Sequence, residues 1–335
     1  MIILLLVAVF LAAVVLTGAM RRYALNRELL DVPNPRSSHT VPTPRGGGVS
    51  IVAAALGAVT LLWLLGAISA FAFAALFLGG AVVAGIGYLD DQGHVPAHWR
   101  MAVHVIAAVI VVGCAGTLPP VPMFGMERVP GLVGVVLAVL WVTWSLNLYN
   151  FMDGIDGLAA VEAVTVCAGA AFLLWFVGEL EWALVTAVYG AASLGFLVWN
   201  WPPAKIFMGD GGSGFLGFSL AALALLAFTE TGFPIWSWLI LLGVFIVDAT
   251  VTLIHRLIRG ERWYAAHRSH AYQHAAREVG SHLPVTVVTG LINLTWLLPL
   301  AWLAVLNPGW GLVIMLVAWL PLLLIALRFG AGSQR

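Results

Sequence analysis

The sequence predicts an all-α membrane protein that crosses the bilayer many times, on three observations. Of its 335 residues, 62% are hydrophobic and 9% are charged, whereas a soluble domain carries about 25% charged residues. The hydrophobic residues form runs of about 20, the length that an α-helix needs to cross the hydrocarbon core. The charged residues gather in connections too short to form a soluble domain. We therefore expect membrane lipids as surroundings and no nucleic-acid partner.

Eleven hydrophobic runs predict transmembrane helices. They lie at about 2–20, 47–66, 69–89, 100–118, 131–148, 159–177, 183–200, 213–229, 236–255, 284–304 and 309–327. Arg21 and Arg22 follow the first run, whereas a secretory signal carries its positive charge before the apolar stretch, so we expect a retained helix. The second and third runs are joined by a tight Gly-Ala-Ile-Ser turn. Residues 1–335 are thus expected to form a single integral membrane domain.

The distribution of basic residues predicts the orientation of these helices. Alternating spans place one set of connections on a common face, namely 21–46, 90–99, 149–158, 201–212, 256–283 and the C-terminal tail. If Arg100 is assigned to its helix mouth, this face holds every Lys and Arg except Arg128. The positive-inside rule makes this face cytoplasmic. We expect a periplasmic N-terminus and a cytoplasmic C-terminus.

Two adjacent acids, Asp90 and Asp91, end the third run on this face. Neighbouring residues on a helix point about 100° apart, so one carboxylate can face a metal while the other faces a different partner. Alternatively, the two acids only mark the water boundary. The helix dipole disfavours acids at a helix C-terminus, which argues against that alternative. We therefore expect both acids to belong to a functional site.

Segment 147–158 adds four polar side chains, each three residues from the next. They are Asn147, Asn150, Asp153 and Asp156. On an ideal α-helix each step of three falls about 60° short of a full turn, so the first and last would lie on opposite sides. Gly154 and Gly157 can break or tighten the helix. We expect such a break to bring all four side chains together.

Two glycine-rich segments on the same face suggest contact with anions. Residues 205–214 contain Asp210, a natural oxygen ligand for Mg²⁺, among glycines that let backbone N–H groups meet phosphate at a helix start. The first loop contains Gly46–Gly48, which permits close backbone approach to an anion. The alternative for this loop is an ordinary basic segment at the membrane surface. Its polar residues include Arg36, His39 and Arg45.

The last large connection, 256–283, is rich in arginine and histidine, which can grip a diphosphate. Zinc has no support, because neither a thiolate nor an HExxH pattern accompanies the histidines. Asp248 lies about two helical turns inside the membrane from Arg256. An acid at that depth has either a function or an internal partner. The sequence leaves both alternatives open.

These segments resemble the polyprenyl-phosphate N-acetylhexosamine-1-phosphate transferases over roughly residues 31–275. Five motifs carry the resemblance: Pro-Arg-Gly-Gly-Gly, Leu-Asp-Asp, Asn-x-x-Asn-x-x-Asp-Gly-x-Asp-Gly-Leu-Ala, Phe-Met-Gly-Asp-x-Gly-Ser and Arg-Ser-His-x-x-Gln. The resemblance implies that an undecaprenyl-phosphate oxygen attacks the β-phosphorus of a UDP-N-acetylsugar and that UMP leaves. It also implies a bacterial inner membrane, with the active site facing the cytoplasm.

The resemblance implies roles for particular residues. It implies Mg²⁺, which Mn²⁺ can replace, held by Asp210 and Asn150. The implied catalytic residues are Asp90, Asp91, Asp153 and His270. The implied substrate-binding residues are Asn147, Asp156, Arg268, Gln273, Arg36, Arg45, His39 and Lys205. A phosphate monoester has its second pKa near 6, so we favour positioning by the acids over obligatory proton removal. A covalent aspartyl-phosphate route is a further alternative.

Departures from the family pattern bear on the substrate. The peptidoglycan translocase branch has three consecutive histidines in the last loop, whereas this chain has His270-Ala-Tyr-Gln-His274. The pattern looks most like the O-antigen-initiating enzymes. It favours UDP-GlcNAc, or a 6-deoxy relative such as UDP-FucNAc, over UDP-MurNAc-pentapeptide. A transporter or lipid flippase is the alternative from another class, but it would place its charges near the midplane. A homodimer also stays open.

Overall fold

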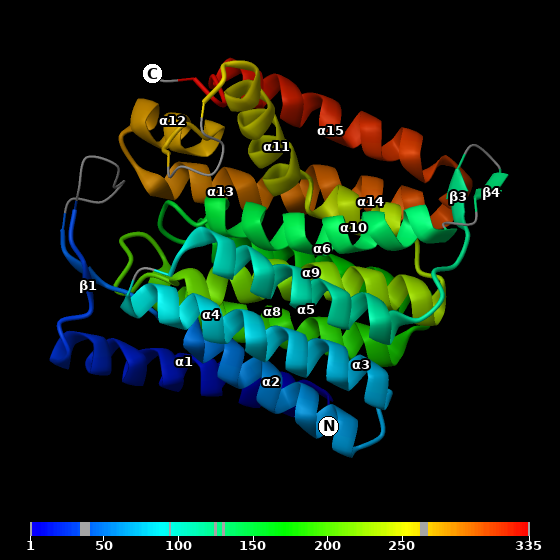
Figure 1. Cartoon of the computed structure of the whole chain (residues 1–335), viewed down its shortest axis with the longest axis horizontal. Helices are drawn as coiled ribbons and strands as arrows, with labels where there is room; N and C mark the ends of the chain where they lie inside the picture. Colours follow the sequence, from blue (N-terminus) through cyan, green and yellow to red (C-terminus); the bar gives the residue numbers. More distant parts are fainter. Residues whose placement is uncertain are drawn as a thin grey trace.

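The computed structural model describes residues 2–33, 41–93, 95–123, 126–128, 131–261 and 267–333. Over these residues the chain forms a bundle of helices with a short two-stranded sheet at either end (Figure 1). The first part contains α1 (Ile2–Asn26), β1 (Leu30–Asp31), β2 (Thr43–Pro44), α2 (Val49–Leu64), α3 (Ala70–Ala74), α4 (Gly80–Gln92), α5 (Ala97–Ala115), β3 (Val121–Met123), β4 (Met126–Arg128) and α6 (Gly131–Met152). The second part contains α7 (Leu158–Phe176), α8 (Leu180–Asn200), α9 (Asp210–Thr231), α10 (Ile235–Leu241), α11 (Gly243–Ile258), α12 (Ala271–Val279), α13 (His282–Ile292), α14 (Leu298–Leu306) and α15 (Gly311–Arg328). Single π-helical turns connect α3 to α4 and α13 to α14.

The helices account for all eleven hydrophobic runs. Within the described residues, nine helical segments are long and apolar enough to cross a membrane, and the pair α10 and α11 would make ten. The second run corresponds to α2, whose 16 residues are fewer than the roughly 20 that a helix needs to cross the hydrocarbon core. The ninth run is divided between α10 and α11, which are bent by 74°. The protein is an all-α polytopic membrane protein, whereas the count of eleven spans and the orientation of the termini stay predictions.

Helix α9 forms the core of the bundle, because its apolar stretch is buried throughout. It packs against α4 and α6 through small residues. A Cβ on Gly217 would lie only 2.6 Å from the carbonyl oxygen of Ser145 in α6. Close approach at small residues is typical of helices in lipid, where apolar side chains gain little by leaving the surrounding hydrocarbon. This packing fixes the position of Asp210, the first residue of α9.

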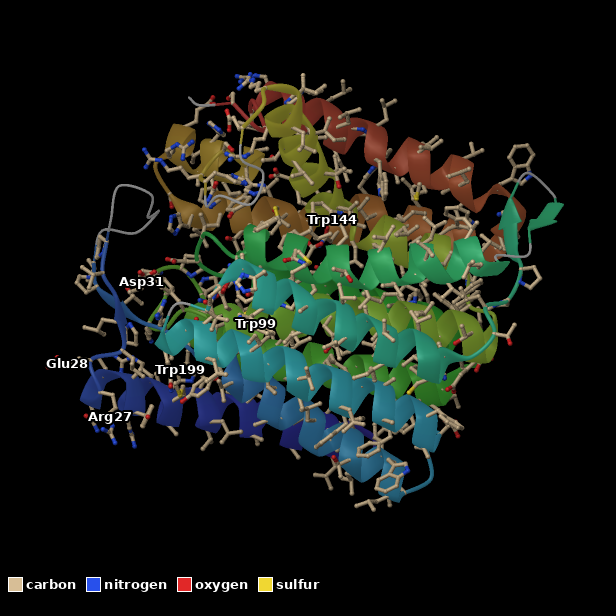
Figure 2. The ribbon with its side chains drawn as sticks, viewed as in Figure 1. Arg27, Glu28, Asp31, Trp99, Trp144 and Trp199 are labelled. Carbon is tan, nitrogen blue, oxygen red and sulfur yellow. The ribbon has the colours of Figure 1, made fainter. Side chains whose placement is uncertain are left out.

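The two ends of the bundle carry different features. The antiparallel β1–β2 sheet, in which Leu30 lies opposite Pro44, is at the same end as α12, and the β3–β4 hairpin is at the other end (Figure 1). Figure 2 shows Arg27, Glu28 and Asp31 at the end that carries β1. The connections α4–α5, α6–α7, α8–α9 and α11–α12 also lie at this end. The loops predicted to be cytoplasmic are therefore gathered on one side.

The last described residues pack against α11 and the segment before α12. Gly332 N donates to the carbonyl oxygen of Ser269 at 2.7 Å. The carbonyl oxygen of Ala331 lies 2.6 Å from His255 Nδ1, and that of Gly332 accepts from Arg259 Nη1 at 3.0 Å. The C-terminal tail thus links α11 to the segment that carries Ser269 and His270.

Candidate active site

Asp210 begins α9, and a carboxylate from α4 sets its position. Asp91 Oδ1 accepts from Asp210 N at 3.0 Å, and Asp91 Oδ2 accepts from Gly211 N at 3.1 Å. Gly209 has a φ of +79°, and a Cβ there would lie 2.6 Å from Asp91 Oδ2, so a side chain does not fit. The free N–H groups of a helix start favour a negative charge. Asp91, which is 7% exposed, therefore caps α9 from a different helix.

Asp90 points toward other partners, as expected for adjacent residues on a helix. Its Oδ1 accepts from Val95 N at 2.8 Å. Its Oδ2 forms an ion pair with Arg100 of α5. The same Arg100 Nη1 lies 3.2 Å from Asp210 Oδ2. Arg100 therefore joins the acid at the end of α4 to the acid at the start of α9.

Asn150 of α6 approaches Asp210 from a third side. Its Nδ2 donates to Asp210 Oδ2 at 3.3 Å, and its Oδ1 accepts from Ser213 Oγ at 2.7 Å. A cavity of about 300 Å³ opens beside these groups. We call it the aspartate cavity. Its polar lining residues are His98, Arg100, His104, Asn147, Asn150 and Asp210.

The four polar residues spaced by three do not meet in one place, which corrects the expectation from the sequence. Helix α6 ends at Met152. Asn147 and Asn150 are on the helix and line the aspartate cavity. Asp156 is in the loop that follows and lines a second cavity of about 660 Å³. The break after Met152 thus places Asn147 and Asn150 at one cavity and Asp156 at another, whereas Asp153 lines neither.

Asp153 is in the same loop and has an acidic environment. Removal from water raises the pKa of its carboxyl group well above the ordinary value, and the negative charges of Asp210, Asp91 and Asp156 raise that pKa further. A carboxyl group surrounded by three other acids favours either a bound proton or a nearby cation. Asp153 therefore lies within the electrostatic range of the aspartate cavity.

The second cavity, which we call the arginine cavity, lies between the α6–α7 loop, the α8–α9 connection and α12. Its charged, amide and imidazole lining residues are Asp156, Arg268, Gln273, Arg277 and His282. Asp156 Oδ2 accepts from Ala204 N at 3.1 Å, which ties the loop to the α8–α9 connection. Arg277 donates to the carbonyl oxygen of Arg268 through both Nη atoms, at 3.3 and 3.4 Å. Both arginines line this wall.

Asp248 has an internal partner, and this decides between the two alternatives left by the sequence. Its Oδ1 accepts from Ala271 N and its Oδ2 from Tyr272 N, both at 3.0 Å. His270 Nδ1 lies 3.2 Å from Asp248 Oδ1, where it donates a hydrogen bond. Asp248 therefore caps α12 in the way that Asp91 caps α9. It also orients the His270 ring.

His270 is 2% exposed and lies close to the end of α6. Its ring stacks on His267 with centroids 4.9 Å apart. Burial lowers the pKa of His267 to about 3, and the adjacent His270 and Arg256 contribute in the same direction. Tyr272 Oη donates to the carbonyl oxygen of Phe151 at 3.0 Å, an approach for which Gly154 leaves room. The start of α12 is thus joined to the loop that carries Asp153.

The glycine run of the first loop packs against protein backbone. Gly47 N donates to the carbonyl oxygen of Phe207 at 2.9 Å, and Gly48 N to that of Met208 at 2.8 Å. A Cβ on Gly48 would overlap the backbone of Gly212 in α9. The expectation that this run approaches an anion is therefore corrected, because these two N–H groups are already engaged. The run lets the start of α2 pack against the start of α9.

The remaining predicted binding residues differ in where they lie. Arg45 donates to the carbonyl oxygen of Asp91, and so contacts the end of α4. Lys205 is exposed, with its Nζ 5.8 Å from the centroid of the Trp199 ring, and does not line either cavity. Gln273 Oε1 accepts from His270 N at 3.3 Å at the edge of the arginine cavity. Arg36 and His39 lie outside the described residues.

The groups best placed to hold a metal ion are the carboxylate of Asp210 and the amide of Asn150. In the part of the chain that the structure describes, no three His, Cys, Asp or Glu side chains meet in a metal-binding geometry. A hard cation that binds phosphates needs only one or two carboxylates from the protein. The pair is therefore sufficient for such a cation, but not for a structural metal site.

Comparisons with known proteins decide the family. Residues 73–228 match the family model described as glycosyl transferase family 4. A decaprenyl-phosphate N-acetylglucosaminephosphotransferase of Mycobacterium leprae (strain TN) is 30% identical over 303 residues, which cover 81% of this chain and 76% of that protein. The chain belongs to glycosyl transferase family 4. A probable undecaprenyl-phosphate N-acetylglucosaminyl 1-phosphate transferase of Bacillus subtilis (strain 168) is 29% identical over 293 residues, 84% of this chain and 79% of that protein.

Membership of glycosyl transferase family 4 confirms the resemblance stated from the motifs. A phospho-N-acetylmuramoyl-pentapeptide-transferase of Halalkalibacterium halodurans is 40% identical, but over only 96 residues, 28% of each chain. The matched region 73–228 contains Asp90, Asp91 and Asp210 and ends before α12. The helices that build the aspartate cavity are therefore the family-4 region, whereas part of the arginine cavity lies beyond it.

Sequence reasoning missed five arginine and histidine residues that line the cavities, namely His98, Arg100, His104, Arg277 and His282. Arg100 was assigned only to the start of a helix, although a cation near two acids at the membrane boundary could have indicated an ion pair. Arg277 and His282 carried no signal, because their contact with the other loops requires α12 and α13 to fold back toward α6 and α7. The roles of the predicted site residues stay predictions.

Proposed function

We propose that the protein transfers an N-acetylhexosamine-1-phosphate group from a UDP-sugar to undecaprenyl phosphate, releasing UMP, at the cytoplasmic face of a bacterial inner membrane. The observation that supports this most is the meeting of Asp210, Arg100 and Asn150 beside a cavity at one end of the bundle. The relatives from B. subtilis and M. leprae are named for transfer of N-acetylglucosamine phosphate to polyprenyl phosphates. We take UDP-GlcNAc as the first candidate donor, and UDP-FucNAc as the second.

The proposed reaction exchanges one phosphoanhydride for another, so the protein mainly positions groups and neutralises charge. An oxygen of the lipid phosphate forms a bond to the β-phosphorus, and the bond from that phosphorus to the UMP oxygen breaks. Arg100 already lies between Asp90 and Asp210, where its guanidinium can meet phosphate oxygens with two parallel hydrogen bonds. Asp91 holds the start of α9, and with it the carboxylate of Asp210.

The donor atoms of the aspartate cavity fit Mg²⁺, which we propose as the cofactor. Asp210 supplies a carboxylate and Asn150 an amide oxygen, both hard ligands of the kind that Mg²⁺ prefers. The pKa of Asp153 is raised first by burial and then by the negative charges of Asp210, Asp91 and Asp156, and this local negative charge supports the proposal of a cation. When bound, the ion would neutralise diphosphate oxygens. Asn150 would present its Oδ1 by releasing Ser213, which at present donates to it.

The arginine cavity is the proposed site of the nucleotide sugar. Arg268 and Arg277 supply positive charge at one wall. Asp156 and Gln273 supply oxygens that can accept hydrogen bonds from hydroxyl and amide groups of the ligand. The contact of His270 Nδ1 with Asp248 Oδ1 fixes the orientation of the His270 ring. Asp156 of the loop 153–157 lines this cavity, and Asn150, six residues earlier, lines the aspartate cavity.

The experiment that tests the function measures UMP release by the purified protein. The assay contains undecaprenyl phosphate, MgCl₂ and one of UDP-GlcNAc, UDP-FucNAc, UDP-GalNAc or UDP-MurNAc-pentapeptide. We expect release with UDP-GlcNAc or UDP-FucNAc, and its loss after chelation with EDTA. Release of UMP with none of the N-acetylsugars would refute the transferase proposal. Release with the pentapeptide donor alone would instead assign the peptidoglycan branch.

A matched pair of variants tests the site itself. Asp210→Asn is expected to lower turnover by about 10²–10³-fold, because it removes the carboxylate proposed to hold the Mg²⁺ that would neutralise the diphosphate. Glu230→Gln removes an acid at the end of α9, where Glu230 accepts from Ser69 Oγ, and is expected to keep wild-type turnover. Equal activity of the two variants would remove Asp210 from the catalytic centre. A transporter would show neither UMP release nor this difference.

A further inference from the structure

The start of α13 holds the backbone of the loop 153–157 at a single residue. Asp156 N donates to His282 Nδ1 at 3.3 Å. The carbonyl oxygen of Asp156 accepts from Thr286 Oγ1 at 2.8 Å. His282 and Thr286 are four residues apart on one helix, so they lie on the same face. That face thus binds both the N–H and the C=O group of one loop residue.

The same contact includes the carboxylate of Asp156. Its Oδ2 lies 3.3 Å from His282 Nδ1 and accepts from Ala204 N at 3.1 Å. The backbone of Asp156 is therefore fixed by α13, and the hydrogen bond to its Oδ2 comes from the α8–α9 connection. Among the described residues, Oδ1 has no hydrogen-bond partner, which leaves this oxygen available to a ligand.

These residues belong to the wall of the arginine cavity. Asp156, Ala204 and His282 all line it, as do Arg268 and Arg277. His282 is well buried, with 17% of its side chain exposed. An imidazole at this position does not need to touch the ligand in order to affect its binding. It can act through the backbone of Asp156, whose N–H group donates to its Nδ1.

We propose that His282 is a positioning residue for the nucleotide sugar, acting through Asp156. This inference rests on the proposed function. If His282 orients Asp156, its loss weakens binding of the UDP-sugar, because a misdirected carboxylate no longer meets the donor's N–H or O–H groups. Binding of the lipid phosphate at the aspartate cavity and the chemical step are left largely unchanged. The signature is a change in the KM of one substrate only.

The test compares His282→Ala with His282→Asn in the full-length protein. Alanine removes the acceptor for Asp156 N, whereas asparagine places an amide oxygen close to the position of Nδ1. We expect alanine to raise the KM for the UDP-sugar about tenfold, the size expected when one hydrogen bond is lost. The KM for undecaprenyl phosphate and kcat should change less than about twofold. Asparagine should recover most of the donor affinity.

Two further variants keep the test decisive. Thr286→Val removes only the hydrogen bond to the carbonyl oxygen of Asp156 and should raise the donor KM in the same way, even if His282→Ala folds poorly. Thr295→Ala removes a hydroxyl that bonds within its own helix and should match wild type. An unchanged donor KM in both His282→Ala and Thr286→Val would overturn the inference. A fall in kcat together with a rise in both KM values, without recovery in His282→Asn, would overturn it as well.

A separate binding measurement distinguishes failure of this inference from failure of the proposed function. Calorimetry with UDP-GlcNAc and MgCl₂ needs no turnover. If wild type releases no UMP from any donor, the transferase proposal fails, but a weaker Kd in His282→Ala would still support His282 as a determinant of nucleotide binding. Equal Kd values for wild type and His282→Ala would refute the role of His282 whatever the activity.

Discussion

Replacing Asp91 with asparagine tests whether this acid acts by holding α9 or by taking a proton. Its two carboxylate oxygens accept from Asp210 N and Gly211 N, at 3.0 and 3.1 Å. An asparagine keeps one acceptor oxygen and turns an NH₂ group toward the second backbone N–H. Asp91→Asn therefore disrupts the cap and leaves the shape of the side chain almost unchanged.

The size of the effect follows from these two hydrogen bonds. A bond to an ionised group contributes about 1.5–3 kcal/mol and a neutral one about 1 kcal/mol. The pair amounts to about 3–6 kcal/mol, of which asparagine keeps about 1 kcal/mol. The lower cost of burying a neutral amide offsets part of the difference. We expect the free energy of unfolding to fall by about 2 kcal/mol and turnover to fall by about 10²-fold as Asp210 shifts.

The assays are unfolding of the detergent-solubilised protein and the pH dependence of UMP release. Asp90→Asn is the comparison, because it breaks a partly exposed ion pair with Arg100 and leaves the cap intact. A partly exposed pair contributes about 0.2–1 kcal/mol, so Asp90→Asn should destabilise less. Wild-type stability in Asp91→Asn, together with loss of the acid limb of its pH profile, would show that Asp91 is a base and refute the reasoning.

Three other predictions concern pH and packing. In EDTA-treated protein the raised pKa of Asp153 means that the folded state keeps a proton that the unfolded state has lost. The free energy of unfolding therefore falls as the pH rises from about 4 to the raised pKa, by up to about 1.4 kcal/mol per pH unit. Thermal unfolding across pH should show this slope in wild type and a smaller one in Asp153→Asn; equal slopes would contradict the assignment. Gly48→Ala places a methyl group against the backbone of α9 and should cost about 2–3 kcal/mol, whereas Gly57→Ala, which meets open space in α2, should be neutral or slightly stabilising. Gly332→Ala puts a Cβ 2.5 Å from His255 at a φ of +78°, whereas Gly260→Ala meets no neighbour at a φ of +70°. The free energy of unfolding and the rate of UMP release should therefore both fall further in Gly332→Ala than in Gly260→Ala. Equal effects would show that the C-terminal tail does not support the segment before α12.

Hydropathy was enough to locate the helices but not their internal geometry. All eleven apolar runs lie on helices, because a run of that length beside lipid must satisfy its backbone hydrogen bonds internally. The 74° bend between α10 and α11 could not be predicted, since the sequence is apolar on both sides of Gly243. A Cβ at Gly243 would lie 3.0 Å from Trp319 Nε1 of α15. The bend therefore occurs at a packing contact that hydropathy does not reveal.

For the site, the sequence predicted which loops share a face but not which atoms meet. Asp90, Asn150 and Asp210 come together because alternating spans return their segments to one end of the bundle. The partner of Asp248 could not be predicted, since it consists of backbone N–H groups more than twenty residues along the chain. The separation of Asn147 from Asp156 depends on where α6 ends, and helix ends are the least certain part of any sequence-based assignment.

The cap between Asp91 and the first turn of α9 has a consequence for how the protein is made. The two partners are 119 residues apart. A ribosome adds about 5–20 residues per second, so the nascent chain carries this acid for about 6–24 s before its partner has been synthesised. During that interval α5 through α8 are synthesised ahead of the helix around which the bundle finally packs. The aspartate cavity is therefore completed only when α9 inserts between neighbours that preceded it into the bilayer.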